Sequence, residues 1–238
     1  MKIKAIITGS TGMVGEGVLH ICLNNPNVES VLVINRKSCG VNHPKLKEII
    51  HKDFMDLTEI EEKLVGYNAC YFCAGVSSVG KKEEEYRKIT YNLTLNFAKT
   101  LHNIHAERSR SMNKSLDSAR DERVGLTFMY VSGTGTDSTE KGKSMWARIK
   151  GKTENDLLNL GFKDAYMFRP GYIQPIKGLK NTYTIYKFLS SFYPIFEKLF
   201  PKYVISLEEL GKSMINVTLN GYEKKVLENI DIRITATI

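Results

Sequence analysis

The sequence predicts an α/β fold with a doubly wound parallel sheet, followed by a small helical region. Short apolar, β-branched runs alternate with stretches of helical periodicity over the first two thirds of the 238 residues. These runs are apolar throughout, as expected for strands that are buried on both faces. A glycine-rich turn directly follows the first run. Alternation of this kind needs crossover connections, and crossovers produce parallel strands with helices on both faces of the sheet.

The amino-terminal half is expected to alternate strictly. Strands are predicted over residues 3–8, 30–36, 46–54 and 68–75, and helices over 14–25, 57–66 and 83–104. The last of these helices carries apolar residues three and four apart, the spacing that forms one apolar face.

The carboxyl-terminal half continues the pattern and then departs from it. Strands are predicted over 126–133 and 164–173, helices over 146–161 and 206–221, and a closing element over 226–238. We expect a single domain over 1–238, with a lid or substrate region at about 176–225. Its aromatic stretch 183–203 fits a substrate lid, a dimer surface or a membrane-surface helix. Pocket lining or subunit contact is favoured, because Pro194 and Pro201 interrupt any long amphipathic helix.

Residues at about 106–123 are polar and highly charged, where a short connection is normal. They are interpreted as an insertion, either an exposed loop or a polar helical extension. A basic arm is the alternative, but the interspersed acids make this segment nearly neutral.

Charge and hydropathy bound the class of protein. The net charge of +8 is compatible with nucleic acid, an anionic lipid surface or an anionic ligand as partner. Because the basic residues are scattered among acids, we do not expect nucleic-acid binding. No apolar run long enough for a membrane-spanning helix occurs, and the amino-terminal stretch resembles a first strand more than a signal peptide. A cytoplasmic protein is therefore expected.

The cysteines and histidines indicate no redox or metal centre. Cys70 and Cys73 match C-x-x-C, but they lie in an apolar strand, where residues three apart point to opposite faces. They are interpreted as structural thiols. The five histidines show no metal-ligand spacing, so no metal site is expected.

The glycine-rich turn predicts a nucleotide cofactor. Gly9, Gly12 and Gly15 have G-x-x-G-x-x-G spacing between the first strand and the first helix. Such glycines supply a tight turn, close approach to a pyrophosphate, and close helix–strand packing, while the helix N-terminus faces the anion. The predicted contact residues are Gly9, Ser10, Thr11, Gly12, Met13, Val14 and Gly15.

The end of the second strand predicts which dinucleotide binds. An acid there would bind the ribose 2′-hydroxyl of NAD, but the chain has Asn35, Arg36 and Lys37. A guanidinium suits a 2′-phosphate. NADP(H) is therefore favoured over NAD(H), with a solvated Arg36 as the alternative.

Over residues 1–175 the chain resembles the atypical or extended branch of the short-chain dehydrogenase/reductase superfamily. Within it, the chain is most similar to NADP-binding proteins like the human Tat-interacting protein, often labelled NAD-dependent epimerase/dehydratase-like. The motifs that carry the resemblance are "TGSTGMVG" at 8–15, "DF" at 53–54, "CAG" at 73–75, Asn92, "VSGTG" at 131–135, Lys150 and "FRPG" at 168–171.

The resemblance implies a NAD(P)-binding Rossmann fold and a set of cofactor contacts. It places Asp53 and Phe54 at the adenine, and Ala74 and Gly75 on the ribose side. Asn92 would support a proton relay and Lys150 would bind the nicotinamide ribose. The nicotinamide would be flanked by Arg169, Pro170 and Gly171. The resemblance also makes a homodimer possible, through the fourth and fifth helices.

The superfamily's catalytic centre combines a Ser, a Tyr and a Lys. Ser132 or Thr134 supplies the first group, and Lys150 the third. Trp146 stands four residues before that lysine, at the tyrosine position, and an indole N–H is a donor only. The Y-x-x-x-K pattern of Tyr183 and Lys187 follows the sixth strand, and is interpreted as coincidence.

Two functions follow. The favoured hypothesis is an NADP(H)-dependent oxidoreductase of atypical mechanism, acting on an unidentified small carbonyl or alcohol. The alternative is a non-catalytic NADP(H)-binding regulator or redox sensor. A nucleotide-sugar epimerase is less favoured, because it too would need the missing tyrosine.

Overall fold

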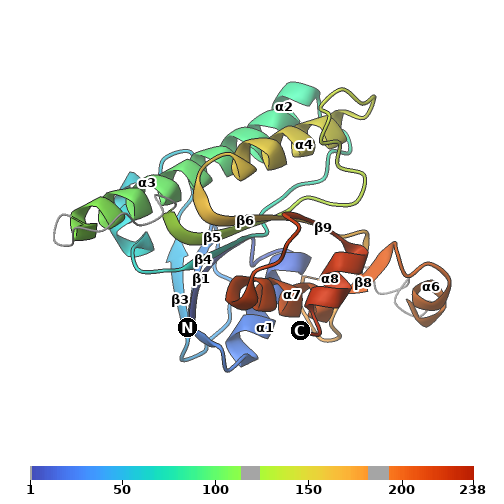
Figure 1. Cartoon of the computed structure of the whole chain (residues 1–238), viewed down its shortest axis with the longest axis horizontal. Coiled ribbons are helices and arrows are strands. Elements are labelled where there is room, and N and C mark those ends of the chain that lie inside the picture. The colour runs from blue at the N-terminus through green and yellow to red at the C-terminus, as the bar shows by residue number, and fades with distance from the viewer. Residues whose placement is uncertain (1, 114–123, 182–192) are drawn as a thin grey trace.

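The structure is a computed structural model that describes residues 2–113, 124–181 and 193–238. Seven parallel strands form the central sheet in the order β3-β2-β1-β4-β5-β6-β9 (Figure 1). These strands are β1 (Ile3–Thr8), β2 (Val28–Asn35), β3 (Leu46–Ile50), β4 (Ala69–Phe72), β5 (Val124–Val131), β6 (Phe162–Arg169) and β9 (Val226–Glu228). A separate parallel pair consists of β7 (Tyr172–Gln174) and β8 (Val204–Ser206).

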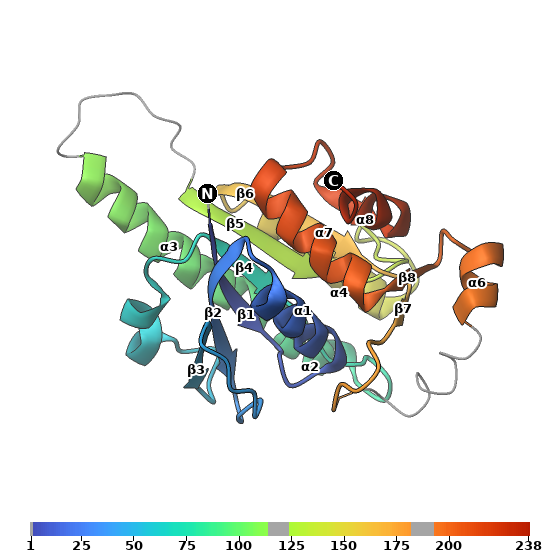
Figure 2. The same cartoon turned by 90° about the horizontal axis from the view of Figure 1, so that it is seen from below.

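Helices cover both faces of the sheet (Figures 1 and 2). One face is covered by α1 (Met13–Asn24), α7 (Leu207–Asn220) and α8 (Asn229–Thr235). The other is covered by α2 (Glu83–Arg87), a π-helical turn (Lys88–Asn92), α3 (Leu93–Asn113) and α4 (Met145–Leu158). A 3₁₀ helix (Thr58–Leu64) precedes β4, and α6 (Tyr193–Leu199) follows β7. The predicted doubly wound α/β fold is confirmed.

The core consists of two apolar layers separated by the sheet. Alternate residues of β1 face opposite layers, so Ile7 packs with Leu19 of α1 and Leu210 of α7. Ile6 packs in the other layer, with Phe97 of α3. This division follows from the two-residue period of a strand and explains why β1 is apolar throughout.

The sheet order creates one crevice. The chain runs from β1 outward through β2 and β3, then returns to β4 on the other side of β1. Ligands of such sheets bind outside the carboxyl ends of the strands, where the order reverses. The glycine turn after β1 and the segments that follow β2, β4, β5 and β6 therefore meet at one edge.

Several boundaries differ from the sequence predictions. The predicted helix 57–66 is a 3₁₀ helix, and the predicted helix 83–104 has a π-helical turn and continues to Asn113. The start of the expected insertion is therefore helix, and its residues 114–123 lie outside the described part of the chain. The strand predicted over 164–173 is divided, because Pro170 has no N–H to continue the ladder. The closing element is a strand followed by a helix.

No helix in the described ranges has both the length and the apolar character needed to span a bilayer.

Candidate functional site

The steric environment differs among the three glycines of the turn. Gly9 has a φ of +72°, and a Cβ there would lie 2.7 Å from the main-chain N of Ala74. A Cβ on Gly15 would lie 2.2 Å from the carbonyl O of Gly9. A Cβ on Gly12 would meet, among the described residues, only that same carbonyl, at 3.4 Å. Gly9 and Gly15 are therefore required for packing, whereas Gly12 leaves space.

The space at Gly12 lies where an anion could approach a helix N-terminus. Gly12 caps α1 with an extended backbone and no side-chain capping bond, and its N–H donates to Gly9 O at 2.9 Å. A missing Cβ at this point lets a pyrophosphate approach the first turn, so the turn fits a dinucleotide. Of the predicted contact residues, Ser10 and Met13 are buried and face inward, while Thr11 and Val14 are half-buried.

A hydrogen-bonded chain joins this turn to the end of β2. Ser10 Oγ donates to Asn35 Oδ1 at 2.9 Å, and Asn35 Nδ2 donates to Glu48 Oε1 at 2.9 Å. The carboxylate of Glu48 also accepts from Ser38 Oγ at 2.6 Å and from the N–H of Cys39 at 2.8 Å. Partial burial opposes ionisation of Glu48, but these donors outweigh it and lower the pKa of that carboxyl.

Glu48 was missed by sequence reasoning, because it lies in β3 and not at the end of β2. Lys47 and Glu48 are both exposed in β3, so no local signal indicates that the Glu48 side chain projects toward the end of β2. Arg36 is exposed at the start of the same loop, so its guanidinium is accessible to a ligand.

The adenine-side residues differ from one another. Phe54 is buried and stacks on Phe97, with ring centroids 5.9 Å apart. Asp53 is exposed and accepts from the N–H of Met55 at 2.8 Å. Asn96 Nδ2 donates to the carbonyls of Phe54 and Met55 at 3.1 and 3.0 Å. Phe54 therefore fixes this loop on α3, and Asp53 is the one of the predicted pair that faces solvent.

Ala74 and Gly75 follow β4 beside the glycine turn. The N–H of Ala74 donates to Thr8 Oγ1 at 3.2 Å, which holds the end of β4 against the end of β1. A Cβ on Gly75 would meet no described atom within 4 Å. This part of the crevice is open.

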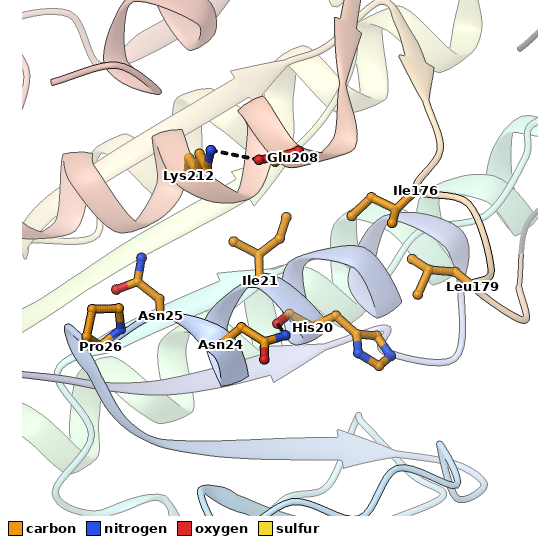
Figure 3. A pocket seen from close by; sticks show the side chains of 9 residues that line it. All are labelled: His20, Ile21, Asn24, Asn25, Pro26, Ile176, Leu179, Glu208 and Lys212. Carbon is orange, nitrogen blue, oxygen red and sulfur yellow. Dashed lines mark hydrogen bonds and ion pairs between the residues drawn. The ribbon is translucent and has the colours of Figure 1, made fainter.

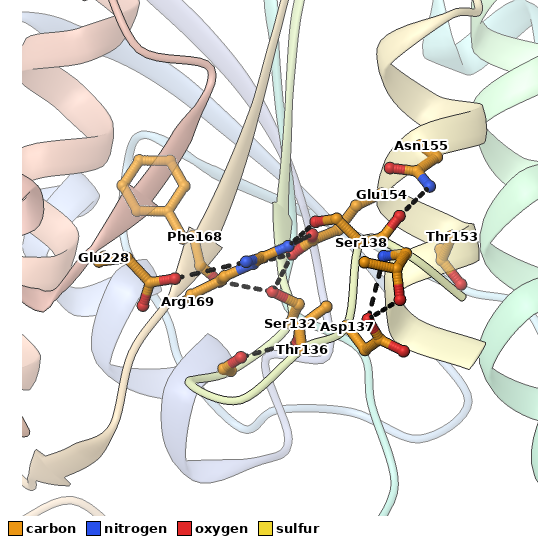
Figure 4. Close-up of polar contacts among 12 residues, drawn as sticks. Ser132, Thr136, Asp137, Ser138, Thr153, Glu154, Asn155, Phe168, Arg169 and Glu228 are labelled. Atoms are coloured by element: carbon orange, nitrogen blue, oxygen red, sulfur yellow. Dashed lines mark hydrogen bonds and ion pairs between the residues drawn. The ribbon is translucent and has the colours of Figure 1, made fainter. Parts of the chain in front are cut away.

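At the end of β5, both candidate hydroxyls are already engaged. Ser132 is buried, and its Oγ donates to Glu154 Oε1 at 2.5 Å, with the carbonyl of Phe168 also within reach at 3.1 Å (Figure 4). Thr134 Oγ1 donates to the carbonyl of Arg169 at 3.0 Å. A hydroxyl has one proton to donate, so neither side chain has a donor left for a substrate carbonyl.

A buried ion pair accounts for the orientation of Ser132. Glu154 of α4 is fully buried and accepts from Nε of Arg169 at 3.1 Å and from Nη2 of the same guanidinium (Figure 4). Arg169 also donates to Ser138 Oγ at 2.5 Å and pairs with Glu228 of β9 at 3.4 Å. The family resemblance implies that Arg169 flanks the nicotinamide, but in the structure its guanidinium is bonded to Glu154, Ser138 and Glu228. Glu154 was missed, although it lies one helical turn after Lys150.

Lys150 reaches the end of β5 from α4. Its ammonium donates to the main-chain carbonyl of Ser132, and a Cβ on Gly133 would lie 3.9 Å from its Nζ. Burial lowers the pKa of Lys150 to about 8, and nearby Glu154 opposes the shift only in part. The lysine can therefore lose or regain a proton near neutral pH.

The remaining predicted residues differ in exposure and in what they contact. Trp146 is half-buried, and a Cβ on Gly135 would lie 3.4 Å from its ring. Asn92 is exposed in the π-helical turn. Pro170 is buried, and a Cβ on Gly171 would lie 2.2 Å from the carbonyl of Tyr203, so Gly171 is required for the β7–β8 pair. Tyr183 and Lys187 lie outside the described residues.

In the described ranges, His, Cys, Asp and Glu side chains form no group of three that could hold a metal ion. A cavity of about 430 Å³ lies elsewhere, between the carboxyl-terminal half of α1 and the start of α7 (Figure 3).

Fold and turn together define a protein with a NAD(P)-binding fold of the short-chain dehydrogenase/reductase and epimerase type. Residues 5–117 match the model of the NAD dependent epimerase/dehydratase family. The resemblance predicted from the sequence is therefore confirmed.

Curated relatives are fungal proteins. The chain is 23% identical to "Protein FMP52, mitochondrial" of Coccidioides immitis over 70% of this chain and 64% of the relative. It is 26% identical to the protein of that name in Meyerozyma guilliermondii, over 71% of this chain and 65% of the relative. The match thus spans just under two thirds of these relatives.

Solved structures share the fold at low identity. A UDP-N-acetylglucosamine 4-epimerase from Methanobrevibacter ruminantium superposes with a TM-score of 0.62 at 16% identity, covering 95% of this chain and 76% of that one. A short-chain dehydrogenase from Burkholderia cenocepacia, solved in complex with NADP, also gives 0.62, at 12% identity, covering 98% and 91%.

The expectation of a cytoplasmic protein is wrong by these comparisons. It rested on the lack of a recognisable targeting signal, whereas the curated relatives are named as mitochondrial proteins.

Proposed function

We propose that this protein is an NADP(H)-dependent oxidoreductase of atypical mechanism that acts on a small carbonyl or alcohol. The observation that carries the proposal is the glycine turn, in which Gly9 and Gly15 are packed tight and Gly12 is left open at the start of α1. A pyrophosphate that approaches the main chain at Gly12 gives a reason for that difference.

NADP(H) is favoured over NAD(H) by the charges at the end of β2. Arg36 and Lys37 are exposed there and can pair with a 2′-phosphate. The nearby carboxylate of Glu48 accepts hydrogen bonds from Asn35, Ser38 and the Cys39 N–H, so it is occupied by protein donors.

Bound at this crevice, the nicotinamide would supply or accept a hydride. The chain must then move one proton, and Trp146 cannot do so. Lys150 holds a proton at Nζ beside Gly133, and its pKa of about 8 suits exchange near neutral pH. In this mechanism Lys150, directly or through water, takes the place of the missing tyrosine, and Trp146 forms a flat wall beside Gly135.

A second function, NADP(H) binding without hydride transfer, is favoured by one observation. Ser132 and Thr134 both donate inward, to Glu154 and to the carbonyl of Arg169. A regulator or sensor needs the dinucleotide site and has no need for those hydroxyls.

Calorimetric titration with NADPH, NADP⁺ and NADH, alongside a Gly12→Val variant, tests the binding. We expect tight binding of both NADP forms, weaker binding of NADH and none by the variant. Absence of binding by the wild type would overturn both functions.

A Trp146→Tyr variant then separates the two functions. We assay it beside the wild type and Lys150→Met with NADPH and a panel of small aldehydes and ketones. Turnover by the wild type that is lost in Lys150→Met supports the oxidoreductase. Tight NADPH binding without turnover in the wild type and in Trp146→Tyr supports the regulator.

A further inference from the structure

A segment far along the chain crosses the cofactor helix. Residues 175–181, here called the strap, follow β7. The main-chain N–H groups of Lys180 and Asn181 donate to Glu16 Oε1 and Oε2 at 2.9 and 2.8 Å. Glu16 lies in the first turn of α1, directly after Gly15, and is only 5% exposed. Burying a carboxylate is costly unless it is well paired, so these two bonds fix the strap on α1.

Apolar contacts also hold the strap against the core. Ile176 and Leu179 pack on the core layer beneath α1, and Figure 3 shows them beside His20 and Ile21 of that helix. Cys39 and Val41, from the loop after β2, pack on the same layer. The strap and the β2 loop therefore share one apolar base, although about 140 residues of sequence separate them.

The strap brings a third cation to the loop that follows β2. A Cβ on Gly40 would lie 3.9 Å from Nζ of Lys180, so that ammonium lies over the β2 loop. The loop itself is held in place, because Gly40 N–H donates to Ser38 Oγ at 3.1 Å and Glu48 holds Ser38 and Cys39. Arg36 and Lys37 begin the same loop. Two cations come from the loop, and one comes from the strap.

We infer that Lys180 is a specificity-determining residue for a 2′-phosphorylated adenosine, and that Glu16 is the positioning residue that brings it there. This inference rests on the proposed NADP(H) function. A phosphate monoester carries about two negative charges at neutral pH and offers three acceptor oxygens. Several cations that approach it from different sides can therefore all strengthen its binding. The 2′-hydroxyl of NAD is uncharged, so these cations would not strengthen the binding of NAD in the same way.

The test measures how well each variant distinguishes a 2′-phosphate. We titrate adenosine 2′,5′-bisphosphate, adenosine 5′-monophosphate, NADPH and NADH into the wild type, Lys180→Met, Lys180→Arg and Lys177→Met. Lys177 is an exposed lysine of the same strap and serves as the matched control. We expect Lys180→Met to weaken NADPH and the bisphosphate about tenfold and to leave NADH and the monophosphate within about twofold, because one charge-assisted contact is lost. Lys180→Arg should restore binding, and Lys177→Met should resemble the wild type.

Glu16→Gln should lower the ratio of NADPH to NADH affinity in the same direction, since it weakens the anchor of the strap. The thermal midpoint of each variant is measured beside the affinities.

The outcomes separate the inference from the function. Equal weakening of all four ligands by Lys180→Met, or no weakening, overturns the assignment of Lys180. An equal effect of Lys177→Met also overturns the assignment of Lys180, because the loss of affinity would then not depend on which lysine of the strap is removed. Dinucleotide binding without preference for the 2′-phosphate leaves a cofactor site and removes this subsite. Binding of neither dinucleotide by the wild type refutes the proposed function itself.

Discussion

The two ends of the crevice are built in opposite ways. At the glycine turn, a Cβ on Gly12 would meet only the Gly9 carbonyl, at 3.4 Å, and a Cβ on Gly75 would meet no described atom within 4 Å. Arg36 is exposed nearby along the chain, after β2. At the ends of β5 and β6, Ser132 and Arg169 bond to Glu154. The first, here called the open end, leaves room for a ligand. At the second, here called the filled end, the polar side chains hydrogen-bond to one another.

Under the proposed function, this difference means that binding and chemistry can change independently on one fold. The proposed dinucleotide site depends on backbone shape and on space, and the glycine turn supplies both. A proton-relay centre depends on side chains whose donors are free, and here Trp146 replaces the expected tyrosine while the hydroxyls face inward. Five variants test this contrast.

The largest effect is expected at the filled end. Glu154→Gln removes the buried partner of Arg169 and leaves its guanidinium only the longer pair with Glu228, and breaking such a buried pair costs about 3–5 kcal/mol of unfolding free energy. Urea denaturation measures this loss. Glu208→Gln is the control, because its pair with Lys212 is exposed and contributes at most ~1 kcal/mol. Equal losses in the two variants would show that the network is not a structural centre.

Two glycine variants test the open end. Gly15→Ala forces a Cβ to within 2.2 Å of the Gly9 carbonyl, and such overpacking costs about 2–3 kcal/mol. Gly12→Ala meets that carbonyl at 3.4 Å, so its stability should change by less than ~0.5 kcal/mol while dinucleotide affinity falls. Thermal melts and NADPH titration check both. A Gly12→Ala protein that binds normally would refute the open-site interpretation.

Lys150 lies at the filled end, beside Ser132 and Gly133, and its removal should be stabilising. Burial lowers its pKa from 10.5 to about 8, so the unfolded chain holds the proton more tightly than the fold does. The penalty is complete below pH 8 and disappears as the pH rises toward 10.5. Lys150→Met should therefore gain about 2 kcal/mol at pH 7, after allowance for partial exposure, and less at pH 10. A gain that does not change with pH would contradict this cause.

The smallest effect is expected for Ser132→Ala. It removes one donor from the buried carboxylate of Glu154, and Arg169 remains to compensate, so the loss should be about 1 kcal/mol. NADPH affinity should stay unchanged if the hydroxyl is structural. A selective loss of turnover, with stability unaltered, would instead assign Ser132 to catalysis.

Most of the fold was predictable because it depends on local pattern. The continuous apolar runs of β1, β2 and β5 and the glycine turn determine strand type and position without long-range information. The separation of β7 from β6 was less accessible, because it depends on how the backbone near Tyr203 pairs with Tyr172. The division of the tail into β9 and α8 likewise depends on a pairing with β6.

The site was predictable only in its backbone part. Spacing indicates where Gly9, Gly12 and Gly15 lie, but not which groups Glu48, Glu154 and Glu16 accept hydrogen bonds from. Each of these three is an acid in an ordinary strand or helix pattern. Its partners come from loops that only the tertiary fold brings near, so no local signal distinguishes it from a surface acid.

The pairing of β9 with β6 also affects how the molecule is made. Met167 pairs with Val226, and Arg169 pairs with Glu228, across a long stretch of chain. During synthesis on a ribosome, the outer edge of β6 stays unpaired until residues 226–228 emerge from the exit tunnel. For that interval the nascent chain exposes strand hydrogen-bonding groups that other chains can capture. Slow translation over α7 would lengthen this interval, so yield in the cell should depend on chaperones that shield that edge.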